Sequence, residues 1–375
     1  VVGSLTPYWG VYLKSLGYSS KDVGVIGAII LGTRIIAPNF WGWLADKTQR
    51  RLRIIHLGSA MAFVCFTGVL IGQSYAWLVI VISCYTFFWH AVLPQFEVIT
   101  LGYLQGQYQR YGQIRLWGSL GFMAAVVGLG WLFDFLSIKL LPIAILSFLV
   151  LIWLSSFSLK ETSTTKHAES STGFLQLVFH PAILSFLLAS FLLQVSHGPY
   201  YTFYSLYLTE NYGYSSTATG LLWALGVMAE VCIFILMPKI LQRFDVRSLL
   251  LLTFAITAIR WLLIGYCAHW LWVLLFAQLL HAVSFGVAHA VSMEIVRTRF
   301  TGAHQGQGQA LYSSFGFGAG GALGALIGAF VWDYSANMTF LISCLSASLG
   351  FVILYFGLHL PKQDLSISTP ASESS

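Results

Sequence analysis

The chain has 375 residues, of which 57% are hydrophobic and only 9% are charged. A soluble domain carries about 25% charged residues, so this composition excludes an ordinary soluble protein and indicates that most of the surface faces lipid. The formal net charge of +6 could suggest a nucleic-acid partner, but the placement of the basic residues along the chain argues against one.

Twelve apolar runs follow one another along the chain. All but the first are long enough for a membrane-spanning helix, which needs about 20 residues. Only helices or a closed barrel satisfy backbone polar groups in lipid, and a barrel would show short alternating strands, so we expect an all-α integral membrane protein. We interpret the short first run as the end of a truncated first helix. The runs are 1–14, 21–44, 54–73, 76–104, 113–133, 138–159, 181–208, 215–241, 247–267, 269–297, 305–332 and 336–358.

The sequence repeats itself once in the same order. Gly17-Tyr18-Ser19-Ser20 returns 196 residues later as Gly213-Tyr214-Ser215-Ser216, and Gly24 returns as Gly220. Such a parallel duplication predicts two homologous halves and is an architecture of secondary transporters. We expect an N-terminal six-helix bundle over 1–159, a cytoplasmic linker over 160–180, a C-terminal six-helix bundle over 181–360 and a disordered cytoplasmic tail over 361–375.

Basic residues gather on one side of the predicted helices. If the chain starts inside, the outer loops hold only Lys14, Lys21 and Lys139. By the positive-inside rule this bias predicts that both termini are cytoplasmic. The inner loops hold 13 of the 19 basic residues, namely Lys47, Arg50, Arg51, Arg53, Arg110, Lys160, Lys166, Lys239, Arg243, Arg247, Arg297, Arg299 and Lys362.

The loop between the second and third predicted helices carries a family pattern. It resembles the major facilitator signature G-x-x-x-D-[R/K]-x-G-[R/K]-[R/K], with Gln49 where that family usually has glycine. The resemblance implies a gating loop. Asp46 could cap a neighbouring helix end while the basic residues face anionic lipid headgroups; an ordinary basic loop is the alternative. The matching residues are Gly42, Asp46, Lys47, Arg50 and Arg51.

Charged residues and histidines interrupt several apolar runs. An unpaired charge at a helix centre costs about 3 kcal/mol on an insertion scale, so these side chains should pair, lose their charge or line a wet cavity. A lone histidine can also be a hydrogen-bonded core residue, and Arg115 could snorkel to the interface. The set is Arg34, Glu97, Arg115, Glu230, Arg260, His90, His197, His281 and His289.

Four segments resemble bacterial 3-phenylpropionate permeases, which are proton-coupled major facilitator proteins related to the lactose permease. They are Tyr111–Ser119, Gly220–Glu230, Ile259–Trp261 and Leu280-His281. The resemblance implies the major facilitator fold, with two six-helix bundles and 12 transmembrane helices, of which the first is truncated in this chain. It also implies a bacterial inner (plasma) membrane protein whose partners are a small-molecule substrate, protons and the lipid bilayer. We expect a functional monomer with no cofactor and no nucleic-acid partner.

The resemblance also implies site residues. Glu97 and Arg115 match a substrate-binding pair of the lactose permease, and we expect Trp117 to lie near this pair and to bind substrate as well. Glu230, Arg260 and His281 match its Glu, Arg and His on helices 8 to 10 and are the predicted proton-coupling residues. In this prediction Glu230 takes the proton, Arg260 drives its release and His281 links it to substrate. Two positions depart from that relative: Ser284 replaces the proton-carrying carboxylate and Gln278 replaces a lysine.

Aromatic residues crowd the helices that resemble cavity-lining helices of the family, and Tyr8, Tyr200 and Tyr201 are further substrate-binding candidates. An interfacial aromatic belt is the alternative for Tyr8 and Tyr200. Arginine binds carboxylates bidentately and aromatic walls suit a flat apolar body. We therefore expect proton-coupled uptake of a small aromatic or organic acid, such as 3-phenylpropionate, by alternating access.

A sugar or nucleoside/proton symporter of the same fold is the alternative function. An uncoupled facilitator, a drug efflux antiporter and a non-transporting membrane receptor are further alternatives. The chain carries no catalytic or nucleotide-binding fingerprint, so we do not expect an enzyme.

Overall fold

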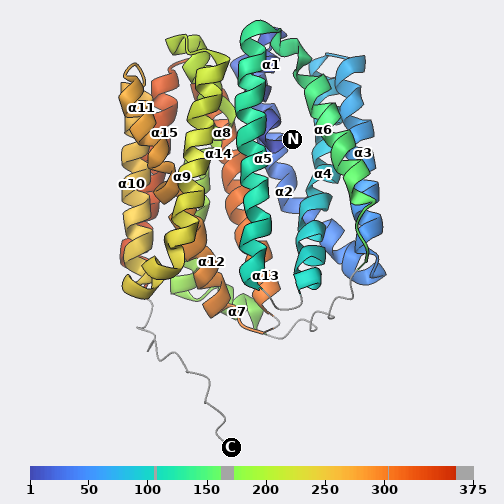
Figure 1. Cartoon of the computed structure of the whole chain (residues 1–375). Helices are drawn as coiled ribbons and strands as arrows, with labels where there is room; N and C mark the ends of the chain where they lie inside the picture. Colours follow the sequence, from blue (N-terminus) through green and yellow to red (C-terminus); the bar gives the residue numbers. More distant parts are fainter. Residues whose placement is uncertain (105–107, 162–172, 303, 360–375) are drawn as a thin grey trace, which may run out of the picture.

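The computed structural model describes residues 1–104, 108–161, 173–302 and 304–359. Long helices run between an upper and a lower end of the molecule, as oriented in Figure 1. Within the described residues, eleven of them are long and apolar enough to cross a membrane, and the shorter α1 (Val2–Ser15) precedes these eleven. Each predicted apolar run corresponds to one of these helices, which confirms the predicted all-α membrane fold.

The first half of the chain forms the helices on the right of Figure 1, and the second half forms those on the left. The first half contains α1, α2 (Ser20–Thr48), α3 (Arg51–Ile71), α4 (Tyr75–Leu104), α5 (Tyr108–Phe135), the short turn η1 (Ile138–Leu140) and α6 (Leu141–Ser156).

Three π-helical turns lie within the second half, so several labelled helices join into single spans. A short helix, α7 (Phe174–Val178), falls within the predicted linker 160–180; the rest of that linker is described only in part, and the predicted tail lies outside the described residues. The spans are α8 (Pro181–Leu206) with η2 (Tyr207–Asn211); α9 (Ser216–Arg243); α10 (Val246–Cys267); α11 (Leu271–Leu279), η3 (Ala282–Val287) and α12 (Ala288–Arg299); α13 (His304–Leu311), η4 (Tyr312–Gly320) and α14 (Gly321–Val331); and α15 (Ala336–Gly357).

The repeated Gly-Tyr-Ser-Ser motif forms the same turn twice. Gly17 and Gly213 have φ angles of 89° and 65°, a left-handed conformation that glycine adopts without steric cost. The serine two residues later caps the next helix: Ser19 accepts a hydrogen bond from the Asp22 N–H, and Ser215 accepts one from the Ala218 N–H. The motif is repeated because each half needs a tight turn followed by a helix start.

The two halves meet closely at the upper end. A Cβ atom added at Gly24 of α2 would overlap Ala329 of α14, and one added at Gly220 of α9 would lie 2.6 Å from the Val126 carbonyl of α5. The Asp134 carboxylate of α5 accepts hydrogen bonds from the first N–H groups of α9. Small residues thus allow the helix backbones to approach.

The buried hydrophobic clusters are shared between the halves at the upper end of the molecule and separate at the lower end. At the upper end one buried cluster includes residues of both halves, such as Leu5 and Val126 from the first and Tyr204 and Trp223 from the second. At the lower end each half has its own buried clusters. The halves therefore pack as one unit above and as two below, except along α2, where Asn39 still donates a hydrogen bond to Ser314 of η4.

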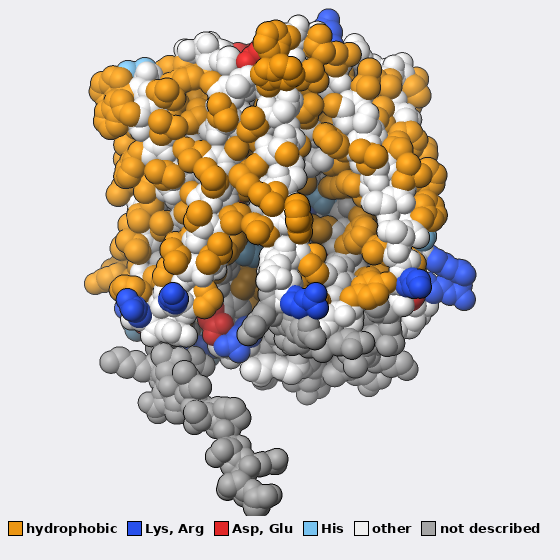
Figure 2. Space-filling model, in the orientation of Figure 1, with side chains coloured by type: hydrophobic (Ala, Val, Ile, Leu, Met, Phe, Trp, Pro, Cys, Tyr) orange, Lys and Arg blue, Asp and Glu red, His pale blue; other side chains and the backbone are white. Residues whose placement is uncertain are grey.

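Basic side chains gather at the lower end of the face shown in Figure 2, below a broad hydrophobic band. This band is the surface expected next to lipid, and the basic rim belongs to the loops that the sequence places inside.

Candidate substrate-binding and coupling site

Arg260 of α10 is fully buried in the second half, and its guanidinium group is engaged on every side. Its Nε donates to the Ala277 carbonyl at 2.9 Å, and its two terminal nitrogens donate to Ser284 and Gln278. The guanidinium carbon also lies 4.5 Å from the centre of the Tyr200 ring. These contacts compensate for burying the charge.

The two residues that depart from the lactose permease pattern are thus acceptors for Arg260. Gln278 also accepts a hydrogen bond from Tyr200 and donates one to Tyr204. A serine and a glutamine replace a carboxylate and a lysine here, so Arg260 is held by neutral groups. Sequence reasoning identified both positions but gave neither a role.

Glu230 of α9 lies 3.6 Å from His281, measured from Oε2 to Nε2, and its side chain is 19% exposed. Two glycines pack against this pair: a Cβ atom at Gly226 would lie 3.4 Å from His281 Cδ2, and one at Gly286 would lie 3.4 Å from Glu230 Cγ. The predicted proximity of Glu230 and His281 is thus present in the structure.

Arg260 is not the cation beside Glu230, contrary to the expectation from sequence. Among the described residues Arg260 forms no ion pair with Glu230. His289 and Arg115 are instead close enough to interact electrostatically with this carboxylate. Because Arg115 belongs to α5 of the first half, Glu230 faces a cation across the boundary between the halves.

Three rings form a ladder on the α11–η3–α12 span. The ring centres of His281 and Phe285 are 5.3 Å apart and those of Phe285 and His289 are 6.2 Å apart, with interplanar angles of 11° and 8°. The ladder spans the π-helical turn η3, a feature frequent at functional sites. Histidine surface is visible in a recess at mid-height of the face in Figure 2.

Glu97 and Arg115 do not form the predicted ion pair in the described part of the chain. Both lie near Tyr111, which interacts electrostatically with each of them, while Arg115 also reaches toward Glu230. Trp117 is 74% exposed. Residues two apart on a helix project about 200° from one another, so Trp117 and Arg115 lie on different faces of α5 and Trp117 does not lie beside the Arg115 side chain.

The three tyrosines predicted to bind substrate have different surroundings. The Tyr8 hydroxyl donates to the Val126 carbonyl of the same half at 2.6 Å and lies 3.4 Å from the Ser216 carbonyl at the start of α9 in the second half, so Tyr8 belongs to the upper contact between the halves and is not free to bind a solute. Tyr200 is enclosed against Arg260 and Gln278. Tyr201 is half-buried and interacts electrostatically with Glu230 and Arg34.

The signature loop closes a contact within the first half. Arg51 forms an ion pair with Asp46 and donates to Gln95 of α4 at 2.6 Å. Asp46 therefore does not cap a neighbouring helix, contrary to the expectation, but ties the end of α2 to α3 and α4. Lys47 lies over the Trp43 ring and Arg50 is exposed. Nothing in the structure requires glycine at Gly42.

Gln49 occupies the position where the signature usually has glycine. It adopts a φ angle of 54°, a left-handed conformation that costs roughly 1–2 kcal/mol for residues other than glycine. Its side chain donates to the Asp46 carbonyl at 2.6 Å. The substitution preserves the turn geometry of the signature at the expense of local strain.

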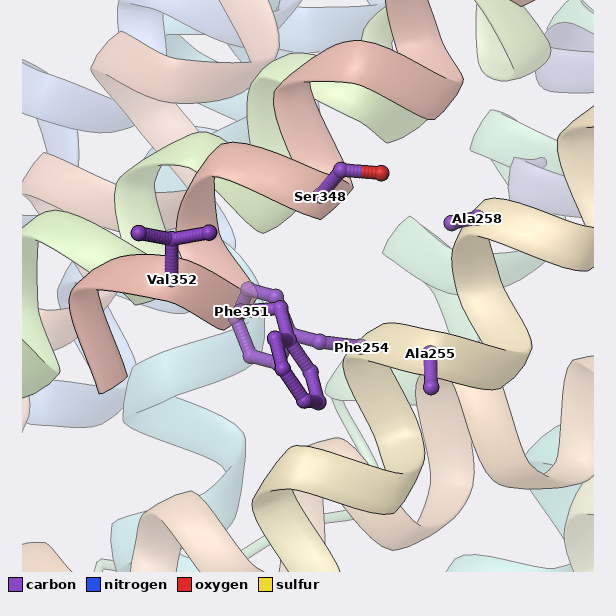
Figure 3. A pocket seen from close by; sticks show the side chains of 6 residues that line it. All are labelled: Phe254, Ala255, Ala258, Ser348, Phe351 and Val352. Carbon is purple, nitrogen blue, oxygen red and sulfur yellow. The ribbon is translucent and has the colours of Figure 1, made fainter. Parts of the chain in front are cut away.

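A pocket of about 230 Å³ lies between α10 and α15, away from these residues (Figure 3). Its only hydroxyl, on Ser348, already donates to the Cys344 carbonyl. The pocket offers no charge or free polar group for a solute, so it is not the candidate site. Its lining residues are Phe254, Ala255, Ala258, Ser348, Phe351 and Val352.

Two membrane-embedded helical halves, joined above and carrying ionisable groups between them, define a secondary transporter. Comparison with known proteins supports this class. The profile of the MFS_1 like family matches residues 1–342, and the chain belongs to that family. Its members are transporters and not enzymes.

Individual relatives cover nearly the whole chain. A protein described as a probable 3-phenylpropionic acid transporter of Escherichia coli (strain K12) is 30% identical over 92% of this chain and 91% of its own length. The maltose permease of Geobacillus stearothermophilus is 27% identical, over 91% of this chain and 88% of its own. The crystal structure of a mutant of the nucleoside transporter NupG superposes with a TM-score of 0.83 at 15% identity, covering 94% of this chain and 95% of that one, which supports the fold alone.

Proposed function

We propose that this transporter takes up a small aromatic organic acid together with protons by alternating access. The observation that carries this proposal is an excess of cations well inside the membrane-spanning helices: Arg34, Arg115 and Arg260 stand against Glu97 and Glu230. An uncompensated positive charge is costly within a membrane, and an anionic solute would balance it. The E. coli relative is described as a transporter of such an acid.

Aromatic rings surround the charged groups. Tyr200 and Trp261 flank the Arg260 guanidinium, and Phe285 stacks on His281. Tyr200 and Trp261 are fully buried and hold the guanidinium, whereas Phe285 is half-buried and can stack against a flat ring of the substrate. An aromatic ring with a carboxylate at one end therefore suits this lining better than a compact inorganic anion does.

Glu230 is the proposed proton-binding group. Its contact with His281 is internal to the second half, whereas its interaction with Arg115 crosses to the first half. A rigid-body movement of the halves would change the second contact and leave the first. A nearby arginine favours the charged form of a carboxylate, so this movement would make Glu230 take up and release a proton. Arg260 then acts as a positioning residue for the helix that carries His281.

Transport in proteoliposomes with an imposed pH gradient tests this proposal. Glu230→Gln mimics the protonated carboxylate, so we expect exchange of 3-phenylpropionate to persist while gradient-driven accumulation is lost. Glu294→Gln is the matched control, because Glu294 pairs with Arg297 near the lower end and its loss should leave both activities unchanged. If Glu230→Gln accumulates substrate as well as the parent does, the proton site is elsewhere or the carrier is uncoupled.

A neutral solute is the second candidate, favoured by the maltose permease relative. The same liposomes should be screened with maltose and uridine. Uptake of either one, with no response to aromatic acids, would replace the acid by a sugar or nucleoside.

We also propose that the protein works as a monomer in the plasma membrane with the lower end toward the cytoplasm. The basic rim supports this orientation. A reporter fused after residue 165 should then be cytoplasmic and one fused after residue 210 external; the reverse pattern would invert the proposed direction of opening.

A further inference from the structure

Arg34 is the one arginine of the central set to which the sequence assigned no role. It lies fourteen residues after Ser20 and fourteen before Thr48, the two ends of α2. At 1.5 Å per residue each end is about 21 Å away, which is beyond the reach of an arginine side chain. A charge held at this depth without a partner is expensive, and such residues mark solute pathways.

The internal repeat relates Arg34 to Glu230. The offset of 196 residues that pairs Gly17 with Gly213 and Gly24 with Gly220 also pairs Arg34 with Glu230. Glu230 likewise lies fourteen residues after the first residue of its helix, Ser216. The two halves thus place opposite charges at the same position of equivalent helices.

Both charges are close enough to Tyr201 of α8 to interact electrostatically with its phenol. The backbone around Arg34 is held against the second half. A Cβ atom at Gly27 would lie 2.8 Å from Thr202 of α8, and one at Gly318 of η4 would lie 3.4 Å from the Arg34 carbonyl carbon. Arg34 therefore lies at the boundary between the halves.

Arg34 also differs from Arg260 in its hydrogen bonding. Arg260 donates to three acceptors. Within the part of the chain that the structure describes, the Arg34 guanidinium donates to none, and the Tyr201 hydroxyl beside it also has no hydrogen-bond partner. His90 interacts with Arg34 only through its charge, and its Nε2 lies 3.2 Å from the Ile30 carbonyl. A guanidinium offers five N–H donors in a planar fork.

We propose that Arg34, assisted by the Tyr201 hydroxyl, binds the carboxylate of the transported acid. The carboxylate accepts two parallel hydrogen bonds from the guanidinium fork, and the aromatic end lies toward the ring ladder of the second half. Glu230, at the equivalent position of the second half, repels an anion when charged and tolerates it when protonated. Substrate binding on Arg34 is thereby linked to protonation of Glu230. This inference rests on the proposed function.

The test is equilibrium binding of 3-phenylpropionate and of its uncharged amide, 3-phenylpropionamide, to the purified full chain. The parent should prefer the acid. Arg34→Gln should weaken acid binding on the order of 10- to 100-fold and leave amide binding unchanged. Arg34→Lys keeps the charge without the planar fork and should bind at an intermediate level. Lys21→Gln, on the same helix near Phe330, should bind as the parent does.

The outcomes separate the two proposals. If the parent prefers the acid and Arg34→Gln binds it equally well, the carboxylate site is elsewhere and the inference is wrong, while the proposed function stands. If the parent itself shows no preference for the acid, the proposed function fails and the inference with it. Tyr201→Phe removes a single hydroxyl and needs no change of charge; it should weaken acid binding several-fold, so the inference can be tested even if Arg34→Gln folds poorly.

Discussion

Helices α2 and α9 are two copies of one helix, and they agree at one end and differ at the other. Both begin with the same glycine turn and serine cap, and both press a glycine, Gly24 or Gly220, against the opposite half. Farther down, α2 stays in contact with η4 as far as Asn39, whereas the hydrogen bonds from α5 to α9 are confined to the upper end. The upper ends, which are alike, hold the halves together. The portions farther down, which differ, carry Arg34 and Glu230.

The largest effect should come from filling the two glycine contacts. Gly24→Ala places a methyl group against Ala329, and Gly220→Ala places one 2.6 Å from the Val126 carbonyl; overpacking of this kind costs about 1–3 kcal/mol. Thermal unfolding in detergent should show similar losses for both variants. Gly32→Ala is the control, because its nearest neighbour would be 3.6 Å away. If Gly24→Ala and Gly220→Ala lose no more thermal stability than Gly32→Ala does, these two glycines are not close contacts between the halves.

The next effect distinguishes the two helix starts. At the start of α2 the Asp22 carboxylate accepts a hydrogen bond from the Ser19 N–H of the same half, whereas at the start of α9 the N–H groups donate to the Asp134 carboxylate of the other half. Carboxylates at helix N-termini contribute roughly 0.3–1 kcal/mol, so Asp134→Asn should loosen the contact between the halves and Asp22→Asn should not.

The buried Thr219 of α9 offers a readout for that loosening. In a cysteine-free background, Thr219→Cys should react with a membrane-impermeant thiol reagent about 2- to 5-fold faster when Asp134 is Asn. Equal reaction rates in the Asp134→Asn and Asp22→Asn variants would show that the Asp134 carboxylate does not stabilise the contact between the halves.

The smallest effect concerns the lower ends. α2 ends at Gln49 in a left-handed conformation, whereas α9 ends at Phe244 in an extended one. Gln49→Gly relieves the strain but loses a side-chain hydrogen bond, so we expect a net gain of about 0.5 kcal/mol. Differential unfolding should detect it as a small rise in melting temperature. Phe244→Gly, where no strain exists, should give no gain; a loss in Gln49→Gly would show that the hydrogen bond to Asp46 outweighs the strain.

The sequence predicted the fold well because its signals are local. The length of each apolar run defined a helix, and the recurrence of Gly17 and Ser19 as Gly213 and Ser215 defined the two halves. The proximity of Glu230 and His281 was also predictable, because both residues match positions of the lactose permease pattern described above. Their roles stay predictions.

Other parts of the site depend on which way helices face, and a single sequence does not encode this visibly. Arg115 forms no ion pair with Glu97 in the described residues but interacts electrostatically with Glu230, and Trp117 falls on the opposite face of α5. Tyr8 contacts the Ser216 carbonyl of the second half and so belongs to the contact between the halves. Arg260 finds neutral acceptors, Ser284 and Gln278, which the sequence marked only as departures. The equivalence of Arg34 and Glu230 could have been found from the sequence, because the two positions are separated by the repeat offset of 196 residues.

That pairing has a consequence for how such a carrier can arise. In a symmetric dimer of identical bundles, every position occurs twice with the same residue, so a cation at this depth would always face a second cation. Joining two copies in one polypeptide removes this restriction, because each copy can then mutate alone. Opposite charges at Arg34 and Glu230 therefore require two non-identical halves, which a single chain with an internal repeat provides.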